Sequence, residues 1–463
     1  MTKPELVRGL GISATTALVA GGVIGTGIFL KSARMAQDVG TPELLLLAWL
    51  AAGLLSLAGA LSYAELGAML PAAGGEYVYL RAAYGDLTAF AFGWMRMAVG
   101  TSGSVASFGA AFAMFLSSLV HLDTVWASRT FSFLGQTVEW KLGSQQIAAV
   151  AVILVFVGLN CFRVAFGGRV QLLLTSAKIL AIAVIVIGVF FFAPSASWQN
   201  FHAPGGAAVG GLSAFGAAML AALWAYDGWN NMPMAAGEVR DPGRNVPRGL
   251  IFGMGIVLLV YGFVNLAYCY ALPITEIAAS SSTLHGDALP VAAKAAATFL
   301  PNYGVKFVAL AAMLSTIGAL NGSLLTGSRI PFAMARDGLF FRRFAEINPR
   351  SAAPVASVLF TGVWSCVLAL SATFDQLTDS VIFAGMIFYA ATTAAVFVLR
   401  RKMPDAPRPY KTLGYPVVPL LFVLVAVWLL ANTLATRALE SVAGLALIAA
   451  GLPVYLVLRR SSR

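Results

Sequence analysis

The residues best placed to do chemistry in this sequence are glycines, in a stretch where a membrane helix would ordinarily carry larger apolar side chains. The sequence GGVIGTG occupies residues 21–27, within the first apolar stretch. Glycine destabilises a helix interior by about 1 kcal/mol relative to alanine, so the run predicts a helix break. Backbone groups freed inside a membrane need partners from protein, water or a ligand. The alternative is that Gly21, Gly25 and Gly27 only allow close helix packing.

A second apolar stretch carries the same kind of interruption five segments later. The sequence WAYDGWNN at residues 224–231 places Asp227, Gly228 and Asn230 in the sixth stretch, and Pro233 follows. Helix packing does not explain a carboxylate at this point. Broken helices at corresponding positions of two halves are typical of transporters built from inverted repeats, which bind their ligand near the membrane midplane.

Two such breaks offer complementary partners to a zwitterion. Free N–H groups near Thr26 and Gly27, at the start of the second half-helix, attract an anion, and the carbonyls that end a half-helix attract a cation. An α-amino acid supplies a carboxylate to the former and an ammonium group to the latter. The carbonyls that we expect to take part are those of Val23, Ile24, Trp224 and Ala225.

The composition predicts that these breaks lie in a membrane. The chain has 463 residues, of which 59% are hydrophobic and 11% charged, whereas soluble domains carry about 25% charged residues. A helical span needs about 20 mostly apolar residues. We predict twelve spans, at about residues 11–37, 44–66, 88–120, 145–162, 171–193, 211–235, 249–272, 304–328, 353–373, 380–399, 416–434 and 441–458.

The distribution of charge predicts the orientation of these spans. The formal net charge is +11, but the charges lie in separate loops rather than on one basic face, which argues against a nucleic-acid partner. If both termini are cytoplasmic, most of the 30 Lys and Arg residues fall on the inner side, as the positive-inside rule requires.

Other classes of membrane protein fit the sequence less well. A membrane enzyme needs an acid, base or metal cluster facing a cavity, and the sequence has no such cluster and no GxxxxGK[ST] or HExxH motif. Its isolated cysteines, Cys161, Cys269 and Cys366, offer neither a disulfide framework nor a CxxC metal site. An ion channel also uses broken backbone, and it would differ from a carrier in conducting ohmic current without counterflow.

Six motifs in order give the chain a resemblance to a known family. They are GGVIGTGIF (residues 21–29), GALSYAELGAMLPAAGGEYVYL (59–80), RVQLLLTSAKILA (169–181), LWAYDGWN (223–230), GEVRDPGRNVPRG (237–249) and LSTIGALNGSLLTGSR (314–329). The chain closely resembles the amino acid–polyamine–organocation superfamily. Within it, the chain is most similar to the L-type exchangers that in animals form the light chains of heteromeric amino acid transporters.

The resemblance implies an all-α integral membrane protein with the LeuT-type fold. In that fold, ten helices form two inverted repeats of five, and helices 1 and 6 are discontinuous. We therefore expect a transport core in residues 1–399, with repeats at about 1–193 and 211–399, and two peripheral helices in residues 400–463.

The resemblance also implies a substrate site at the unwound parts of helices 1 and 6. Trp224 corresponds to the aromatic residue that covers the bound substrate from the outside in this family. The expected substrate-binding residues are Ile24, Gly25, Thr26, Gly27, Trp224, Ala225, Tyr226, Asp227, Gly228 and Asn230.

Lys178 lies inside the fifth stretch, about 10 Å along it at 1.5 Å per residue, and a buried ammonium group needs carbonyl or carboxylate partners. The resemblance implies that this lysine fills the space of the second sodium ion of sodium-coupled relatives, so that transport is sodium-independent. We expect the carbonyl of Gly22 or Val23 and the hydroxyl of Ser315 as its partners. Lys178 is then a permanently charged strut, which we favour, or a group that gains and loses a proton.

The roles of the further polar residues are less specific: Asp227 and Asn230 each have two possible interpretations, and the residues near the inner ends of the second and third stretches have one. Asp227 stands where many relatives carry Gly, Ala or Ser, so it either caps the second half of helix 6 or extends specificity to cationic side chains. Asn230 contacts substrate or satisfies broken backbone. Arg96, near the inner end of the third stretch, is expected to snorkel. Tyr63 and Glu65 lie at the inner end of the second stretch, and the motif GGEYVYL that follows resembles the interfacial helix of the family.

These observations predict a sodium-independent exchanger of neutral L-amino acids that works by alternating access, with no enzymatic activity, cofactor or metal. The alternatives are a proton-coupled amino acid symporter and an exchanger that also accepts cationic amino acids. We expect a monomer in the inner (plasma) membrane, surrounded by lipid, with both termini cytoplasmic. A disulfide-linked heavy chain is not expected, because the loop at residues 121–144 has no cysteine.

Overall fold

The computed structural model describes residues 10–72, 74–133, 136–161, 168–202, 211–282, 285, 288–348 and 354–461. The predicted core at 1–399 therefore begins in a segment, residues 1–9, that lies outside the described residues. In chain order the elements are α1 (Ile12–Val23), α2 (Gly27–Val39), α3 (Pro42–Met69), α4 (Glu76–Tyr84), α5 (Asp86–Met95), η1 (Arg96–Gly100), α6 (Thr101–Ser117), β1 (Val125–Phe133), β2 (Gln136–Gly143), α7 (Ser144–Cys161), α8 (Gly168–Phe192), η2 (Trp198–Phe201), α9 (Gly211–Tyr226), η3 (Trp229–Glu238), α10 (Pro242–Ala271), α11 (Ile274–Ala278), α12 (Val291–Ala297), α13 (Gly304–Gly327), α14 (Arg329–Arg336), η4 (Arg342–Ala345), α15 (Val355–Ser371), α16 (Phe374–Lys402), α17 (Val417–Thr436), α18 (Ala438–Ala449) and α19 (Gly451–Ser461).

The fold is helical, and most of its helices suit a membrane. Within the described residues, nine continuous helical segments are long and apolar enough to cross a bilayer, and the bent pair α1 and α2 brings the number to ten. Each of the ten overlaps a predicted stretch. The other two predicted stretches, 211–235 and 353–373, contain α9 and α15, which are apolar but only 16 and 17 residues long. The chain is thus a multi-pass membrane protein.

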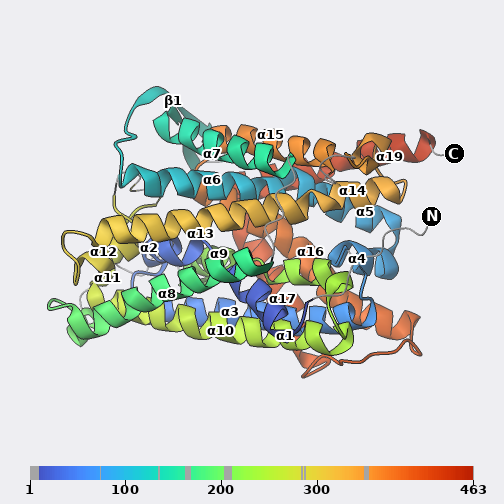
Figure 1. Ribbon diagram of the computed structural model, residues 1–463, viewed down its shortest axis with the longest axis horizontal. Coiled ribbons are helices and arrows are strands. Elements are labelled where there is room, and N and C mark those ends of the chain that lie inside the picture. The colour runs from blue at the N-terminus through green and yellow to red at the C-terminus, as the bar shows by residue number, and fades with distance from the viewer. Residues whose placement is uncertain are drawn as a thin grey trace.

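The long helices lie side by side along one axis (Figure 1). β1, α11 and α12 lie at one end of the molecule, and α4, α14 and α19 lie at the other (Figure 1). The second end carries Arg81, Arg336, Arg342 and Arg343. We refer to it as the inner end, following the positive-inside rule, and to the first as the outer end.

The first span is broken at the glycine run. α1 ends at Val23, α2 begins at Gly27, and the axes of the two helices differ by 43°. Ile24 has an extended backbone, with φ −67° and ψ 93°. Gly27 lies against α9, where a Cβ atom on it would come within 2.5 Å of the Ala225 Cα atom. Only glycine allows this approach of the two backbones.

The sixth stretch is interrupted as well. α9 ends at Tyr226, Gly228 adopts a left-handed conformation with φ +119°, and the 3₁₀ helix η3 follows with Pro233 inside it. A Cβ atom on Gly228 would lie 2.6 Å from the Gly22 carbonyl oxygen. The backbones of the two breaks are therefore in contact at two points, Gly27 with Ala225 and Gly228 with Gly22.

A two-stranded hairpin occupies a region that the sequence analysis treated as a loop. β1 and β2 pair antiparallel, from Val125 opposite Gly143 to Phe133 opposite Gln136. Trp140 fastens the hairpin to the helices, because its Nε1 donates a hydrogen bond of 2.7 Å to the Leu370 carbonyl near the end of α15. The hairpin lies at the outer end (Figure 1).

Candidate functional site

A small cavity lies between the two helix breaks. Its volume is about 20 Å³, which holds about one water molecule. It is lined by Gly22, Val23, Gly25, Thr26, Gly27, Phe108, Trp224 and Asp227. The cavity is too small for an amino acid, so the site has to widen before it can hold a solute of that size. We refer to the conformation with this narrow site as the closed conformation.

Backbone amides at the start of α2 form one side of this cavity. The first N–H groups of a helix have no acceptor within the helix, and the helix dipole makes that end favourable for an anion. Thr26 is the N-cap residue of α2, and its hydroxyl accepts a hydrogen bond of 3.2 Å from the Trp224 Nε1. The Trp224 ring lies between Phe108 and Phe374, with ring centroids 5.5 Å and 6.2 Å away. Aromatic side chains thus cover the amide side of the cavity.

Carbonyls at the ends of α1 and α9 meet on a single tyrosine from α10. The Tyr261 hydroxyl lies 3.1 Å from the Val23 carbonyl oxygen and 2.9 Å from that of Ala225, and it accepts from the Gly25 N–H. One hydroxyl therefore links both breaks. A carbonyl oxygen has two lone pairs, so each of these groups keeps the capacity to accept a second hydrogen bond.

Lys178 reaches the break in helix 1 from α8. Its buried Nζ lies 3.2 Å from the Ile24 carbonyl oxygen and 3.5 Å from that of Gly21. This corrects the expected partners Gly22 and Val23. Carbonyls three residues apart lie on one face of a helix, and the face that meets α8 carries Gly21 and Ile24, while the Val23 carbonyl faces Tyr261 on α10.

The hydroxyl of Ser315, the other expected partner, is buried on α13 without a hydrogen bond in the described part of the chain. It therefore does not bind Lys178 in this conformation. The four expected ammonium-binding carbonyls are also all engaged by the protein itself, since the Trp224 carbonyl accepts from the Asp227 N–H.

On the inner side of the cavity, three polar side chains form a chain of hydrogen bonds. The Asn230 Nδ2 donates to the Tyr389 hydroxyl at 2.9 Å, and that hydroxyl donates to the Asp227 Oδ1 at 2.6 Å. Asp227 also accepts from the Gly228 N–H. Its carboxylate thus meets one backbone amide at the break, as a capping residue does, and also lines the cavity. Asn230 is buried and does not line the cavity.

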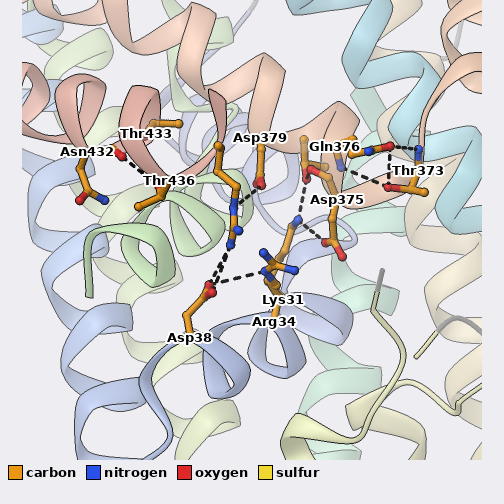
Figure 2. Close-up of polar contacts among 12 residues, drawn as sticks. Lys31, Arg34, Asp38, Thr373, Asp375, Gln376, Asp379, Asn432, Thr433 and Thr436 are labelled. Atoms are coloured by element: carbon orange, nitrogen blue, oxygen red, sulfur yellow. Dashed lines mark hydrogen bonds and ion pairs between the residues drawn. The ribbon is translucent and has the colours of Figure 1, made fainter. Parts of the chain in front are cut away.

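On the outer side, a buried ion pair joins α2 to α16 (Figure 2). The Lys31 Nζ lies 2.7 Å from the Asp375 Oδ1 and donates to the Thr378 hydroxyl at 2.6 Å. The side chains of Lys31 and Asp375 are 0% and 10% exposed. The same ammonium group lies 4.7 Å from the centre of the Phe374 ring, which contacts Trp224. The ion pair is therefore connected to the covering of the cavity.

A second set of charges surrounds that ion pair. Arg437 approaches Asp38 on α2 at 3.1 Å and Asp379 on α16 at 3.5 Å, and Arg34 lies 3.6 Å from Asp38. Figure 2 shows Arg34 and Asp38 on α2 and Asp379 on α16. The outer half of the broken helix is thus held to α16 by two neighbouring groups of ion pairs.

Five of the ten expected substrate-binding residues line the cavity, and the other five lie at the helix breaks without lining it. Gly25, Thr26, Gly27, Trp224 and Asp227 line the cavity. The remaining expected residues, which do not line it, are Ile24, Ala225, Tyr226, Gly228 and Asn230. Tyr226, for example, packs against the rings of Trp49 and Tyr261 instead.

Sequence reasoning missed Phe108, Tyr261, Tyr389 and the pair of Lys31 with Asp375. For Lys31, Tyr261 and Tyr389, the available signal was a polar group inside an apolar stretch, which is costly unless it has a partner. Arg96, expected to snorkel, is instead buried and 7% exposed in η1, within the span 86–117, where its Nη2 lies 3.4 Å from the Asn231 Oδ1. A snorkelling interpretation needs water at the side-chain end, and η3 covers it.

The sequence is similar to those of known proteins over most of its length. The sequence profile of the family described as Amino acid permease matches residues 10–455. The serine/threonine exchanger SteT of Bacillus subtilis (strain 168) is 30% identical over 452 residues, which cover 97% of this chain and 96% of that protein. The human large neutral amino acids transporter small subunit 2 is 30% identical over 463 residues, 97% of this chain and 80% of that protein. The human b(0,+)-type amino acid transporter 1 is 28% identical over 426 residues, 92% of this chain and 82% of that protein.

Proposed function

This chain belongs to the amino acid permease family, and from that premise we propose that it is a sodium-independent exchanger of neutral L-amino acids that works by alternating access. The family and the relatives named above are transporters rather than enzymes. The observation that carries the proposal is the cavity between two helix breaks, with helix-start amides on one side and carbonyls on the other.

In the proposed complex, the substrate carboxylate binds the amides of Thr26 and Gly27. The substrate ammonium group binds the carbonyls of Val23 and Ala225, either through their second lone pairs or in place of the Tyr261 hydroxyl. Both ends of the zwitterion then interact with main-chain groups. Such a site selects the backbone that all amino acids share and leaves the side chain to Phe108, Trp224 and Asp227.

Alternating access requires a barrier on each side of the site, and polar contacts supply candidates for both. On the outer side, the candidate is the ion pair of Lys31 with Asp375, together with the Phe374 and Trp224 rings. On the inner side, it is the hydrogen-bonded chain of Asp227, Tyr389 and Asn230. Opening either barrier alone widens the cavity toward one side, which is the event that exchange needs.

Sodium independence is supported by Lys178. Its ammonium group supplies a positive charge at the Gly21 and Ile24 carbonyls, where a dissociable cation would otherwise stabilise the helix break. The contacts favour the strut interpretation, because both partners are carbonyls and the lysine joins α8 to the end of α1.

For the architecture, we propose twelve spans in the LeuT-type arrangement, counting the short helices α9 and α15. The transport core occupies residues 1–399, and α17 to α19, in residues 400–463, are peripheral. Both termini then lie in the cytoplasm of a cell with this protein in its plasma membrane. We propose a monomer without a disulfide-linked heavy chain, because the region 121–144 lacks cysteine.

A second substrate class is favoured by one observation. The Asp227 carboxylate lines the cavity, so it lies where the side chain of a bound cationic amino acid extends. An exchanger of both classes predicts that Asp227→Asn weakens binding of arginine and lysine and leaves serine and leucine unaffected. If the ranking of substrates is the same in Asp227→Asn as in the wild type, Asp227 does not select substrates and serves only through its hydrogen bonds with Tyr389 and Gly228.

Counterflow in proteoliposomes tests the proposal. Vesicles preloaded with unlabelled amino acid are expected to accumulate labelled amino acid from a sodium-free medium, and empty vesicles are not. Serine, threonine, leucine and arginine form the first substrate panel. If uptake needs no internal amino acid and is driven by an imposed proton gradient, the protein is a proton symporter rather than an exchanger. An ohmic current without counterflow would replace the carrier by a channel.

A further inference from the structure

A second buried polar cluster lies on the inner side of the substrate cavity, and its centre is Glu76. Glu76 is the first residue of α4, which connects the spanning helices α3 and α5. Its side chain is 0% exposed, and neither carboxylate oxygen has a hydrogen bond in the described part of the chain. A buried carboxylate that keeps its charge without hydrogen bonds is costly, and it lowers that cost by taking up a proton.

Groups from several helices face this carboxylate. Tyr63 of α3 and Asn230 of η3 are near enough to interact with it, although neither is aligned for a full hydrogen bond. Arg96 of η1 and Asp227 at the end of α9 act on it through their charges. The remaining titratable neighbours are Tyr79 on α4 itself and Tyr389 on α16, while Arg81, Asp86 and Asp337 form ion pairs that are partly exposed on the other face of α4.

The charges in this cluster balance only when one proton is bound. The Arg96 guanidinium acts on both Glu76 and Asp227, so one positive charge faces two carboxylates. Unbalanced charge in a buried region is unfavourable. A single proton on one carboxylate makes the cluster neutral.

The hydrogen bonds indicate which carboxylate carries that proton. Asp227 accepts from the Tyr389 hydroxyl and the Gly228 N–H, and both bonds stabilise its ionised form. Glu76 accepts none. The side chain of Asn230 interacts with Glu76, and its Oδ1 is a buried acceptor that has no donor among the described residues. The O–H of a protonated Glu76 is a donor of the kind that this acceptor lacks. Burial raises the pKa of Glu76 to about 7, against the opposing effect of Arg96.

We propose that Glu76 is a proton-binding site of this carrier, occupied in the closed conformation and emptied when the inner side opens. The proton comes from cytoplasmic water, forms the O–H bond of the Glu76 carboxyl, and returns to water when hydration of α4 stabilises the carboxylate. Asn230, Tyr389 and Asp227 link this site to the substrate cavity by consecutive hydrogen bonds. The link between proton and transport rests on the proposed function, whereas the proton site itself does not.

Infrared titration of the purified protein tests the site directly. A neutral carboxylic acid has a carbonyl stretching band that its carboxylate lacks. We expect wild-type protein to show such a band that disappears as the pH is raised through about 7. The band is expected to be absent from Glu76→Gln and retained in Glu139→Gln, a control that removes an exposed carboxylate on β2. No titrating band in the wild type, or the same band in Glu76→Gln, would overturn the proposal.

Exchange measured across the same pH range tests the coupling. A single titrating group changes a rate by up to about tenfold per pH unit, and we expect this dependence in the wild type and in Glu139→Gln. Glu76→Gln is expected to flatten the profile, and Glu76→Asp, which restores a titratable group, is expected to recover a sloped one. An identical profile in Glu76→Gln would exclude coupling through Glu76. Absence of exchange in the wild type would refute the proposed function, but the infrared titration would still test whether Glu76 binds a proton.

Discussion

Removal of the outer ion pair is expected to open the site to the outside. In Asp375→Asn, the Lys31 ammonium group stays buried in the closed conformation without its carboxylate partner. A hydrogen bond to a charged group contributes about 1.5–3 kcal/mol, and an uncompensated buried charge costs about 3–5 kcal/mol. The Thr378 hydroxyl and the Phe374 ring remain beside Lys31, so we expect a net cost of about 2–3 kcal/mol.

That cost applies to the closed conformation, because an opened outer side gives Lys31 access to water. The variant therefore shifts the equilibrium toward the outward-open conformation by about 30- to 150-fold. Phe108 lines the cavity, and a Phe108→Cys reporter measures the shift through its rate of labelling by an external thiol reagent. The reporter is introduced after the native cysteines at positions 161, 269 and 366 have been replaced by alanine.

Two controls make this test specific. Glu139→Gln removes an exposed carboxylate and is expected to leave labelling unchanged. The double variant Lys31→Met with Asp375→Leu removes both charges and is expected to label at close to the rate of the reporter alone, because an apolar pair replaces a buried ion pair at little cost. If Asp375→Asn labels no faster than the reporter alone, the ion pair is not part of the outer barrier.

Three further variants and conditions test the rest of the account. Lys178→Ala is expected to abolish exchange while the protein still inserts and keeps its helical circular dichroism, because the Gly21 and Ile24 carbonyls lose their cation; unchanged exchange would remove the bracing role. Gly27→Ala places a Cβ atom 2.5 Å from the Ala225 Cα atom, so we expect the free energy of unfolding, measured by thermal unfolding, to fall by about 1–3 kcal/mol. Gly262→Ala adds a Cβ atom in open space and is the control that we expect to be tolerated. Because folding raises the pKa of Glu76 from 4.5 to about 7, its contribution to stability is full below about pH 4.5 and is lost as the pH rises to about 7. The loss amounts to about 3 kcal/mol, and a wild-type melting curve with the same pH dependence as that of Glu76→Gln would contradict it.

The sequence was most informative where a residue type conflicts with its surroundings. Glycines at 21–27 and Asp227 with Gly228 are unfavourable inside apolar helices, and the structure has its helix ends at these positions. Membrane spans were equally accessible, because apolar length alone defines them. These features depend on local chemistry, which neighbouring residues in the sequence determine.

Partners from distant parts of the chain could not be predicted in the same way. Lys31 and Asp375 are 344 positions apart, and only the packing of α2 on α16 brings them together. The partners of Lys178 depend on which face of α1 meets α8, so an error of one residue selected the wrong carbonyls. Arg96 was expected to snorkel because it lies near the end of an apolar stretch, but it is buried and contacts Asn231 of η3.

Ligand-induced stabilisation of the purified protein tests the central claim most directly, namely that main-chain groups at the two helix breaks bind both ends of an amino acid. A ligand that binds the folded state raises the melting temperature as its occupancy increases. We expect at least one neutral L-amino acid to raise the melting temperature in sodium-free buffer, whereas the carboxamide and the deaminated analogue of that amino acid do not. Equal stabilisation by the amino acid and by both analogues would contradict the account.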